Sequence, residues 1–137
     1  MLISNFKTGT INIKSHATQT GSWIIFDIKH LKPMTLYNFN ICIYGDLREG
    51  YKRLGGHWNP HNATHGIYSS NYHHKRDITR RHAGDLQSYV SDKEGNIKFK
   101  YHDPLVISSK VVGRSIVISQ NRPNKIIAYS VIGFACS

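Results

Sequence analysis

The stretch that decides the fold is residues 55–66, which read GGHWNPHNATHG, followed later by residues 81–86, which read RHAGDL. Together they hold three histidines and one aspartate, namely His57, His65, His82 and Asp85. Seven, sixteen and two residues separate these four in turn. Zinc accepts imidazole nitrogen and carboxylate oxygen, and four such protein ligands make a closed structural site. The spacing is unlike that of two histidines on one helix and indicates a long loop that folds back on itself.

The chain has nine histidines, so some combination of four metal ligands is also expected by chance. Two features favour a metal site over chance. Glycines, prolines and asparagines, which build shaped loops, surround the candidates. In addition, Asp85 stands where a strand-like pattern resumes.

Outside this loop the pattern is nearly all strand, because apolar and polar residues alternate over short segments bounded by turn residues. We expect strands at residues 1–7, 10–14, 23–28, 37–44, 86–90, 97–101, 115–119 and 126–134. Residues 92–96, which read DKEGN, are typical of a hairpin turn. We see no helical stripe of useful length. The 137 residues are therefore predicted to form one all-β domain, 1–137, as a sandwich or closed barrel.

The chain carries 18 Lys and Arg against 8 Asp and Glu, a formal charge of +10. Such a charge attracts anions, nucleic acid or a protein partner with an acidic surface. The densest basic run is residues 73–81, which read HHKRDITRR. It is either a solvated loop or a patch that binds nucleic acid or another anion. The aromatic residues Tyr68 and Tyr72 beside it could stack on bases.

No apolar run approaches the roughly 20 residues that a membrane-spanning helix needs, so no membrane partner is expected. The first residues, MLISNFK, lack the basic start and apolar run of a secretion signal, and we expect an intracellular protein. Two cysteines, Cys42 and Cys136, could form at most one disulfide, which a cytosolic setting disfavours.

Five segments together resemble the copper/zinc superoxide dismutase family. They are residues 55–60 (GGHWNP), 65–66 (HG), 81–86 (RHAGDL), 112–118 (VGRSIVI) and 131–135 (VIGFA), which occur in the order of the family's motifs. The resemblance implies an eight-stranded Greek-key β-barrel with a long zinc-binding loop. It also implies that His57, His65, His82 and Asp85 bind zinc.

The residues at the family's copper positions differ from its pattern. The family binds copper through four histidines, two of them at alternate positions of one strand; here those positions hold Asn40 and Cys42. The position after the Gly-Arg motif holds Ser119, so only His57, which bridges the two metals in the family, is kept. A thiolate and an imidazole could still bind Cu(I).

These replacements predict a protein that binds zinc without copper and has no catalytic residue. It would be a pseudoenzyme acting as a structural or protein-interaction module, for assembly or as a decoy, and viral or virion-associated. One alternative is residual copper binding or superoxide dismutase activity through Cys42 and His57. A second alternative is binding of nucleic acid or another anion through the basic loop 73–81.

The family's loop that guides superoxide is shortened here to about residues 120–125, and its guiding arginine falls on Ile126. The positions of the family's disulfide hold Tyr51 and Tyr129, whose rings could pack in its place. The resemblance also implies a homodimer. Its interface would comprise Gly45, Asp46, Val112, Gly113, Arg114, Val131, Ile132 and Gly133.

Overall fold

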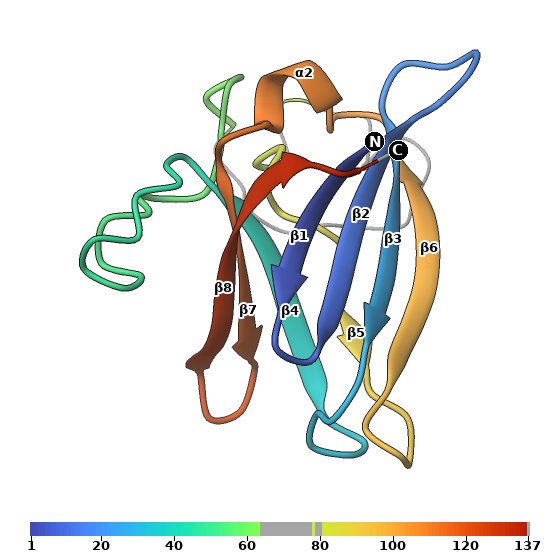
Figure 1. The fold of residues 1–137 in the computed structure, drawn as a ribbon, viewed down its shortest axis with the longest axis vertical. Helices are drawn as coiled ribbons and strands as arrows, with labels where there is room; N and C mark the ends of the chain where they lie inside the picture. The colour runs from blue at the N-terminus through green and yellow to red at the C-terminus, as the bar shows by residue number, and fades with distance from the viewer. Residues whose placement is uncertain (64–77, 79–80, 137) are drawn as a thin grey trace.

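The computed structural model describes residues 1–63, 78 and 81–136. Its elements, in chain order, are β1 (Leu2–Phe6), β2 (Gly9–Ser15), β3 (Ser22–Ile28), β4 (Leu36–Cys42), β5 (Tyr89–Val90), β6 (Ile97–Asp103), α2 (Ser108–Val111), β7 (Ser115–Gln120) and β8 (Lys125–Phe134). The strands form one antiparallel sheet in the order β5-β4-β7-β8-β1-β2-β3-β6, which curls into a nearly closed barrel (Figure 1). The predicted all-β fold of eight strands is confirmed.

The two ends of the sheet order, β5 and β6, meet through side chains. Tyr89 of β5 stacks on Phe99 of β6, with ring centroids 4.7 Å apart and planes within 5°. Nearby, the Gln87 backbone N–H donates to the Tyr101 hydroxyl over 3.1 Å. Aromatic packing therefore joins the barrel at the seam between these two strands.

The barrel core follows from the alternation seen in the sequence. In β3, every second side chain from Ser22 to Ile28 is buried, and the inward residues of the other strands are mostly isoleucines. Phe26 and Phe39 meet edge to face at the centre, 4.8 Å apart. Alternate residues of a strand point to opposite faces, so the intervening side chains face outward.

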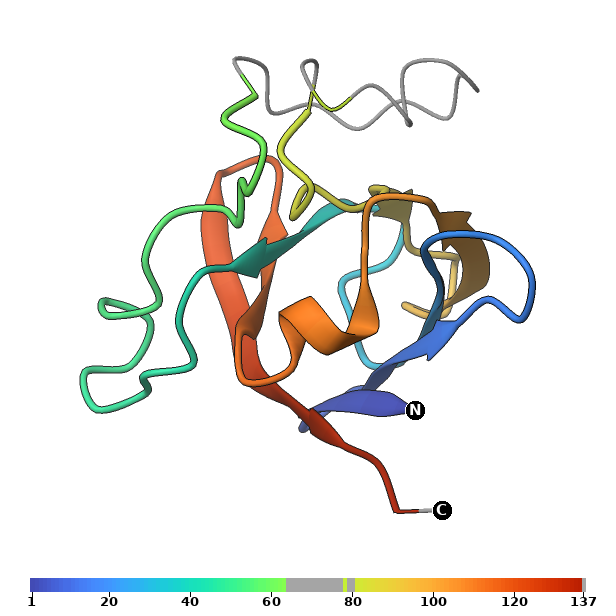
Figure 2. The same cartoon turned by 90° about the horizontal axis from the view of Figure 1, so that it is seen from above.

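Three segments differ from the sequence prediction. The strand expected at 37–44 ends at Cys42 because Ile43 and Tyr44 bond to the returning loop instead, at the carbonyls of Gly56 and Leu54. The strand expected at 86–90 shortens to Tyr89–Val90. Helix α2 was not predicted, because four residues are too few to show a helical period; it lies over one end of the barrel (Figure 2).

Among the described residues, no helix has the length and apolar character required to cross a membrane.

Candidate metal centre

The site is built on the edge of β4, where two parts of the long loop return to the barrel. Single antiparallel bridges pair Asn40 with Asp85 and Cys42 with His57. Residues directly opposite in such a pair, and alternate residues of one strand, project to the same face. The side chains of Asn40, Cys42, His57 and Asp85 therefore share the outer face of β4.

Gly84 allows this close approach. Its N–H donates to the Trp58 carbonyl over 2.8 Å, and its carbonyl accepts from the Ile41 N–H over 2.7 Å. A Cβ at this position would lie 2.4 Å from the Ile41 carbonyl oxygen, so a larger residue would push the strands apart. These close backbone contacts fix the positions of His57, which precedes Trp58, and of Asp85, which follows Gly84.

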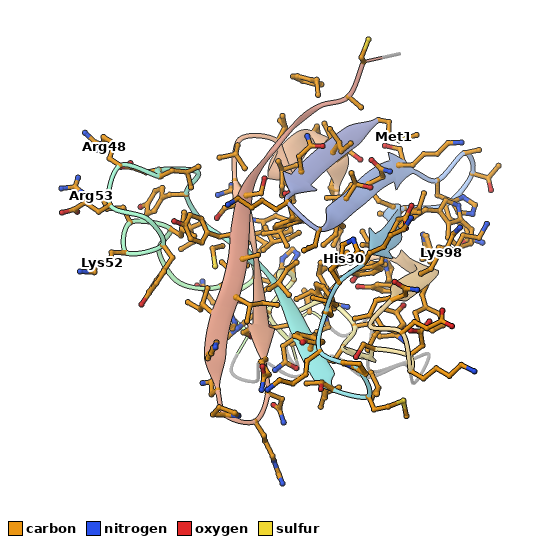
Figure 3. All side chains as sticks on the ribbon, turned by 60° about the horizontal axis from the view of Figure 1, so that its bottom comes forward. Met1, His30, Arg48, Lys52, Arg53 and Lys98 are labelled. Carbon is orange, nitrogen blue, oxygen red and sulfur yellow. The ribbon has the colours of Figure 1, made fainter. Side chains whose placement is uncertain are left out.

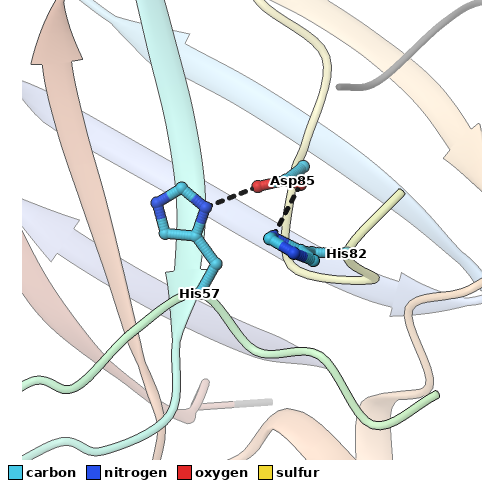
Figure 4. A group of neighbouring side chains, drawn as sticks. All are labelled: His57, His82 and Asp85. Atoms are coloured by element: carbon cyan, nitrogen blue, oxygen red, sulfur yellow. Dashed lines mark ion pairs between the residues drawn. The ribbon is translucent and has the colours of Figure 1, made fainter. Parts of the chain in front are cut away.

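Three of the four predicted zinc ligands come together in the described structure. The ligand atoms of His57, His82 and Asp85 all lie within 4.8 Å of one another. The Nδ1 atoms of the two histidines lie 2.7 and 3.2 Å from the two oxygens of Asp85 (Figure 4). The fourth predicted ligand, His65, lies outside the described residues.

The buried polar atoms of this group fit a zinc ion. Asp85 is 3% exposed. Neither of its oxygens, nor Nδ1 of His82, makes a hydrogen bond of acceptable geometry within the described part of the chain. Burying polar atoms without partners is unfavourable, and a cation between the carboxylate and the imidazoles would satisfy all of them.

The two ring nitrogens of His57 point in different directions. Its Nδ1 faces Asp85, and the ring places Nε2 on the other side (Figure 4). The side chain of His57 is 44% exposed, unlike the buried Asp85. The Nε2 atom can thus bind a second group, next to the position between His57, His82 and Asp85 where a zinc ion fits.

The residues predicted to form the degenerate copper site line one pocket of ≈ 390 Å³. Its walls are Asn40, Cys42, Tyr51, Leu54, Gly55, Gly56, His57, Val117, Ser119, Asn124 and Ile126. Ser119 reaches this face because it pairs with Asn38, two residues before Asn40 in β4. The structure thus gathers a thiol, an imidazole, an amide and a hydroxyl around one space.

The Cys42 thiol sits on the buried side of this pocket. It packs with Leu54 and Val117 in a small apolar cluster. Burial, and then the negative charge of Asp85, raise the pKa of the Cys42 thiol to about 11. The thiol is therefore protonated at neutral pH until a metal displaces the proton.

A buried ion pair that sequence reasoning missed anchors the segment carrying His82. Arg81 and Asp103 are both fully buried, and Nη2 of Arg81 donates to the two Asp103 oxygens over 3.1 and 2.9 Å. Arg81 also donates to the carbonyls of His82 and Ala83. The Tyr101 hydroxyl and the Leu105 N–H complete the bonds to Asp103. No local pattern marks Asp103, because its partner is 22 residues away in the chain.

The residues at the two disulfide positions of the resembled family do contact each other. The rings of Tyr51 and Tyr129 meet edge to face, 6.2 Å apart at 69°. Cys42 carries a free thiol. An aromatic contact therefore joins the long loop to β8.

The remaining predicted sites are placed only in part. Gly45 packs on Gly113, since a Cβ on Gly45 would lie 2.3 Å from the Gly113 carbonyl oxygen. Ile132 is fully buried, so its side chain belongs to the core and cannot contact a partner. Of the basic loop 73–81, only residues 78 and 81 are described. Arg81 is buried against Asp103 and cannot contribute to a basic surface.

Comparison with known proteins identifies relatives over most of the chain. The family model described as copper/zinc superoxide dismutase (SODC) matches residues 7–126. Superoxide dismutase [Cu-Zn] of Neurospora crassa is 33% identical over 118 residues, which are 84% of this chain and 71% of that protein. That of Cordyceps militaris is 31% identical over 113 residues, 80% of this chain and 68% of the relative. That of Paramecium bursaria Chlorella virus 1 is 32% identical over 98 residues, which are 69% of this chain and 48% of that protein.

These relatives correct the prediction of an inactive pseudoenzyme that acts as an assembly or decoy module. All three carry the name of an enzyme, and nothing in the described structure shows a loss of activity. The expectation that copper is absent lacks support too, because the matching family is named for both metals. The prediction was wrong because it gave more weight to the histidines missing from the family's copper positions than to the donor atoms that remain there. Cys42 remains a possible donor in the same pocket as His57.

Proposed function

Because the chain belongs to the copper/zinc superoxide dismutase family, we propose that it removes superoxide with a copper ion held through Cys42 and His57, beside a zinc ion. The observation that carries this proposal is the bridge between Cys42 and His57 at the wall of one pocket. A thiolate and an imidazole are both ligands for Cu(I). Asn40 and Ser119 add weaker oxygen donors to the same pocket.

The proposed zinc ligands are His57, His65, His82 and Asp85. The three that are described already bring their ligand atoms together, and Asp85 offers two oxygens without other partners. Zinc has no redox chemistry, so its role is structural. Bound zinc would fix the orientation of the His57 ring, whose Nδ1 faces Asp85, while His57 also lines the neighbouring pocket.

Copper, when bound, supplies the one-electron couple through which superoxide is converted to oxygen and peroxide. The chain's residues supply the rest. Cys42 would have to release its thiol proton to bind the metal, and its packing against Leu54 and Val117 limits the access of water to the sulfur. Nε2 of His57 can either bind the metal or hold a proton.

Attraction of the superoxide anion to the pocket follows from the charge of the chain. The formal charge is +10. Arg122 and Lys125 are exposed in and beside the turn between β7 and β8, next to the pocket residues Asn124 and Ile126. A positive field raises the local concentration of an anionic substrate. These two side chains take over part of the steering that the family assigns to a longer loop.

The activity test compares two cysteine substitutions. Cys42→Ser should lower the copper-dependent rate of superoxide removal at least about tenfold, because loss of a copper ligand weakens the site more than the roughly 10–100-fold seen for outer partners. The matched control is Cys136→Ser, which changes the exposed thiol outside the pocket and should leave the rate within about twofold. Rates are measured on protein loaded with both metals.

Two results would contradict the proposal. One is a wild-type protein loaded with both metals that removes superoxide no faster than the zinc-only form. The other is an equal rate for the two serine variants, which would place copper elsewhere.

We also propose a homodimer, which the packing of Gly45 against Gly113 supports by bringing two of the expected interface segments together. The predicted interface is then Gly45, Asp46, Val112, Gly113, Arg114, Val131 and Gly133, with Ile132 contributing backbone only. The positive charge supports anionic partners, an acidic protein surface among them. The viral relative supports a viral setting; virion association and an intracellular location stay predictions.

A further inference from the structure

A groove opens where β1 and β8 separate. These strands pair only between Leu2–Ser4 and Ile132–Phe134, and beyond Ser4 they diverge toward the end of the barrel that carries the β1–β2 turn (Figure 1). The groove between them has a volume of ≈ 600 Å³, within the range of small-molecule sites. Its lining residues are Asn5, Phe6, Lys7, Thr8, His30, Leu31, Lys32, Tyr37, Ile127, Ala128 and Tyr129.

The inner wall of this groove is apolar. Phe6, Leu31, Ile127 and Ala128 are partly buried and pack on the barrel core. Tyr37 is 2% exposed, and its hydroxyl accepts a hydrogen bond from the Lys32 backbone N–H over 3.0 Å. A ligand entering here would therefore meet hydrocarbon, with Lys32 held close to the wall by that bond.

The outer residues of the groove carry only positive or neutral groups. Lys7, His30 and Lys32 are all exposed. All eleven lining residues are described, and none of them is a carboxylate. Figure 3 shows His30 by the barrel, apart from the basic residues Arg48, Lys52 and Arg53 on the projecting loop.

The backbone at His30 has an unusual conformation. Its φ is 61°, a left-handed value that residues other than glycine seldom adopt. Residues held in such conformations cluster at ligand-binding sites, because the surrounding structure must offset their cost. Here the conformation lies in the loop that places His30, Leu31 and Lys32 on the groove.

We propose that this groove binds an amphipathic organic anion, with its apolar tail on Phe6, Leu31 and Ile127 and its acidic head beside Lys7 and Lys32. The tail gains from leaving water on the apolar wall. The head gains charge-assisted contacts that an uncharged head cannot make. A carboxylate or a phosphate monoester has the required chemistry. The site does not involve the metal residues, so it stands independently of the proposed enzymatic activity.

The test uses four probes in calorimetric titrations of the full chain: decanoate, decyl phosphate, hexanoate and decanol. We expect decanoate or decyl phosphate to bind, and the tighter of the two identifies the head group. Hexanoate should bind more weakly than decanoate because its tail is shorter. Decanol should bind at least about tenfold more weakly, since hydrogen bonds to charged groups contribute roughly a factor of ten or more.

The variant Lys7→Gln with Lys32→Gln should lose at least about tenfold in affinity for the tighter anion. The matched control is Lys93→Gln with Lys98→Gln, which removes the same charge from exposed residues outside the groove and should change affinity less than about twofold. Both pairs are exposed, so folding should be retained. The proposal is overturned if neither anion binds, if decanol binds as well as the anions, or if both double variants lose equal affinity.

Discussion

Replacing Asp103 with asparagine is expected to lower the free energy of unfolding by about 3–5 kcal/mol, because it leaves the buried charge of Arg81 without its partner. Both side chains are fully buried, and Asp103 accepts bonds from Arg81, Tyr101 and Leu105. An amide can accept at only one of its two end atoms, so part of this network is lost. Urea unfolding of the metal-free variant measures the loss.

The matched control is Asp27→Asn, the same chemical change at a half-buried position on the outer face of β3. It should shift the free energy of unfolding by no more than about 0.5 kcal/mol. The double variant Arg81→Met with Asp103→Leu should recover much of the stability of wild type, since it removes both buried charges. An Asp103→Asn loss no larger than that of Asp27→Asn would show that the buried pair does not hold the barrel together.

The same pair has a consequence for the metal site. Arg81 precedes His82 and bonds to the carbonyls of His82 and Ala83, so it holds the segment that presents His82 to Asp85. The double variant with two apolar residues keeps a filled core but lacks those carbonyl bonds. We therefore expect it to be stable and yet to bind zinc more weakly than wild type.

Removing zinc is expected to lower the melting temperature by about 10 °C at a zinc concentration near one hundred times the dissociation constant, which corresponds to roughly 2.7 kcal/mol. Zinc would join His57 and His82, which come before and after the undescribed segment in the chain. Differential scanning calorimetry with and without chelator measures the shift.

The control for this measurement is a pair of variants. Asp85→Asn should abolish most of the zinc response, because it removes the charged oxygens between the two imidazoles. His30→Gln changes a histidine outside the site and should leave the response intact. Equal melting temperatures with chelator and with added zinc would contradict a structural zinc.

The fold could be predicted largely from sequence because apolar and polar residues alternate along several strands, most clearly along β3. That signal places the strands, but it does not show where a strand's partner changes. After Cys42, the backbone N–H groups of Ile43 and Tyr44 donate to the carbonyls of Gly56 and Leu54. These two acceptors lie in the long loop, where the sequence has no strand pattern. Asp103 was missed for a similar reason, since its partner Arg81 lies outside the strands, 22 residues away in the chain.

The metal site was predicted unevenly. The proximity of His57, His82 and Asp85 follows from their residue types and motif, and the structure brings them together. The prediction of an inactive protein was wrong because it compared residues position by position with four histidines. The resemblance grouped Asn40, Cys42, His57 and Ser119 at the copper positions, and the strand register brings these residues to one pocket.

The measurement that tests the two-metal site most directly is elemental analysis of protein loaded with copper and zinc together and then dialysed. We predict about one zinc and about one copper per chain, with the copper equivalent lost in Cys42→Ser and kept in Cys136→Ser. Zinc without copper in the wild-type protein, or copper that both variants keep equally, would contradict a copper site at Cys42 and His57.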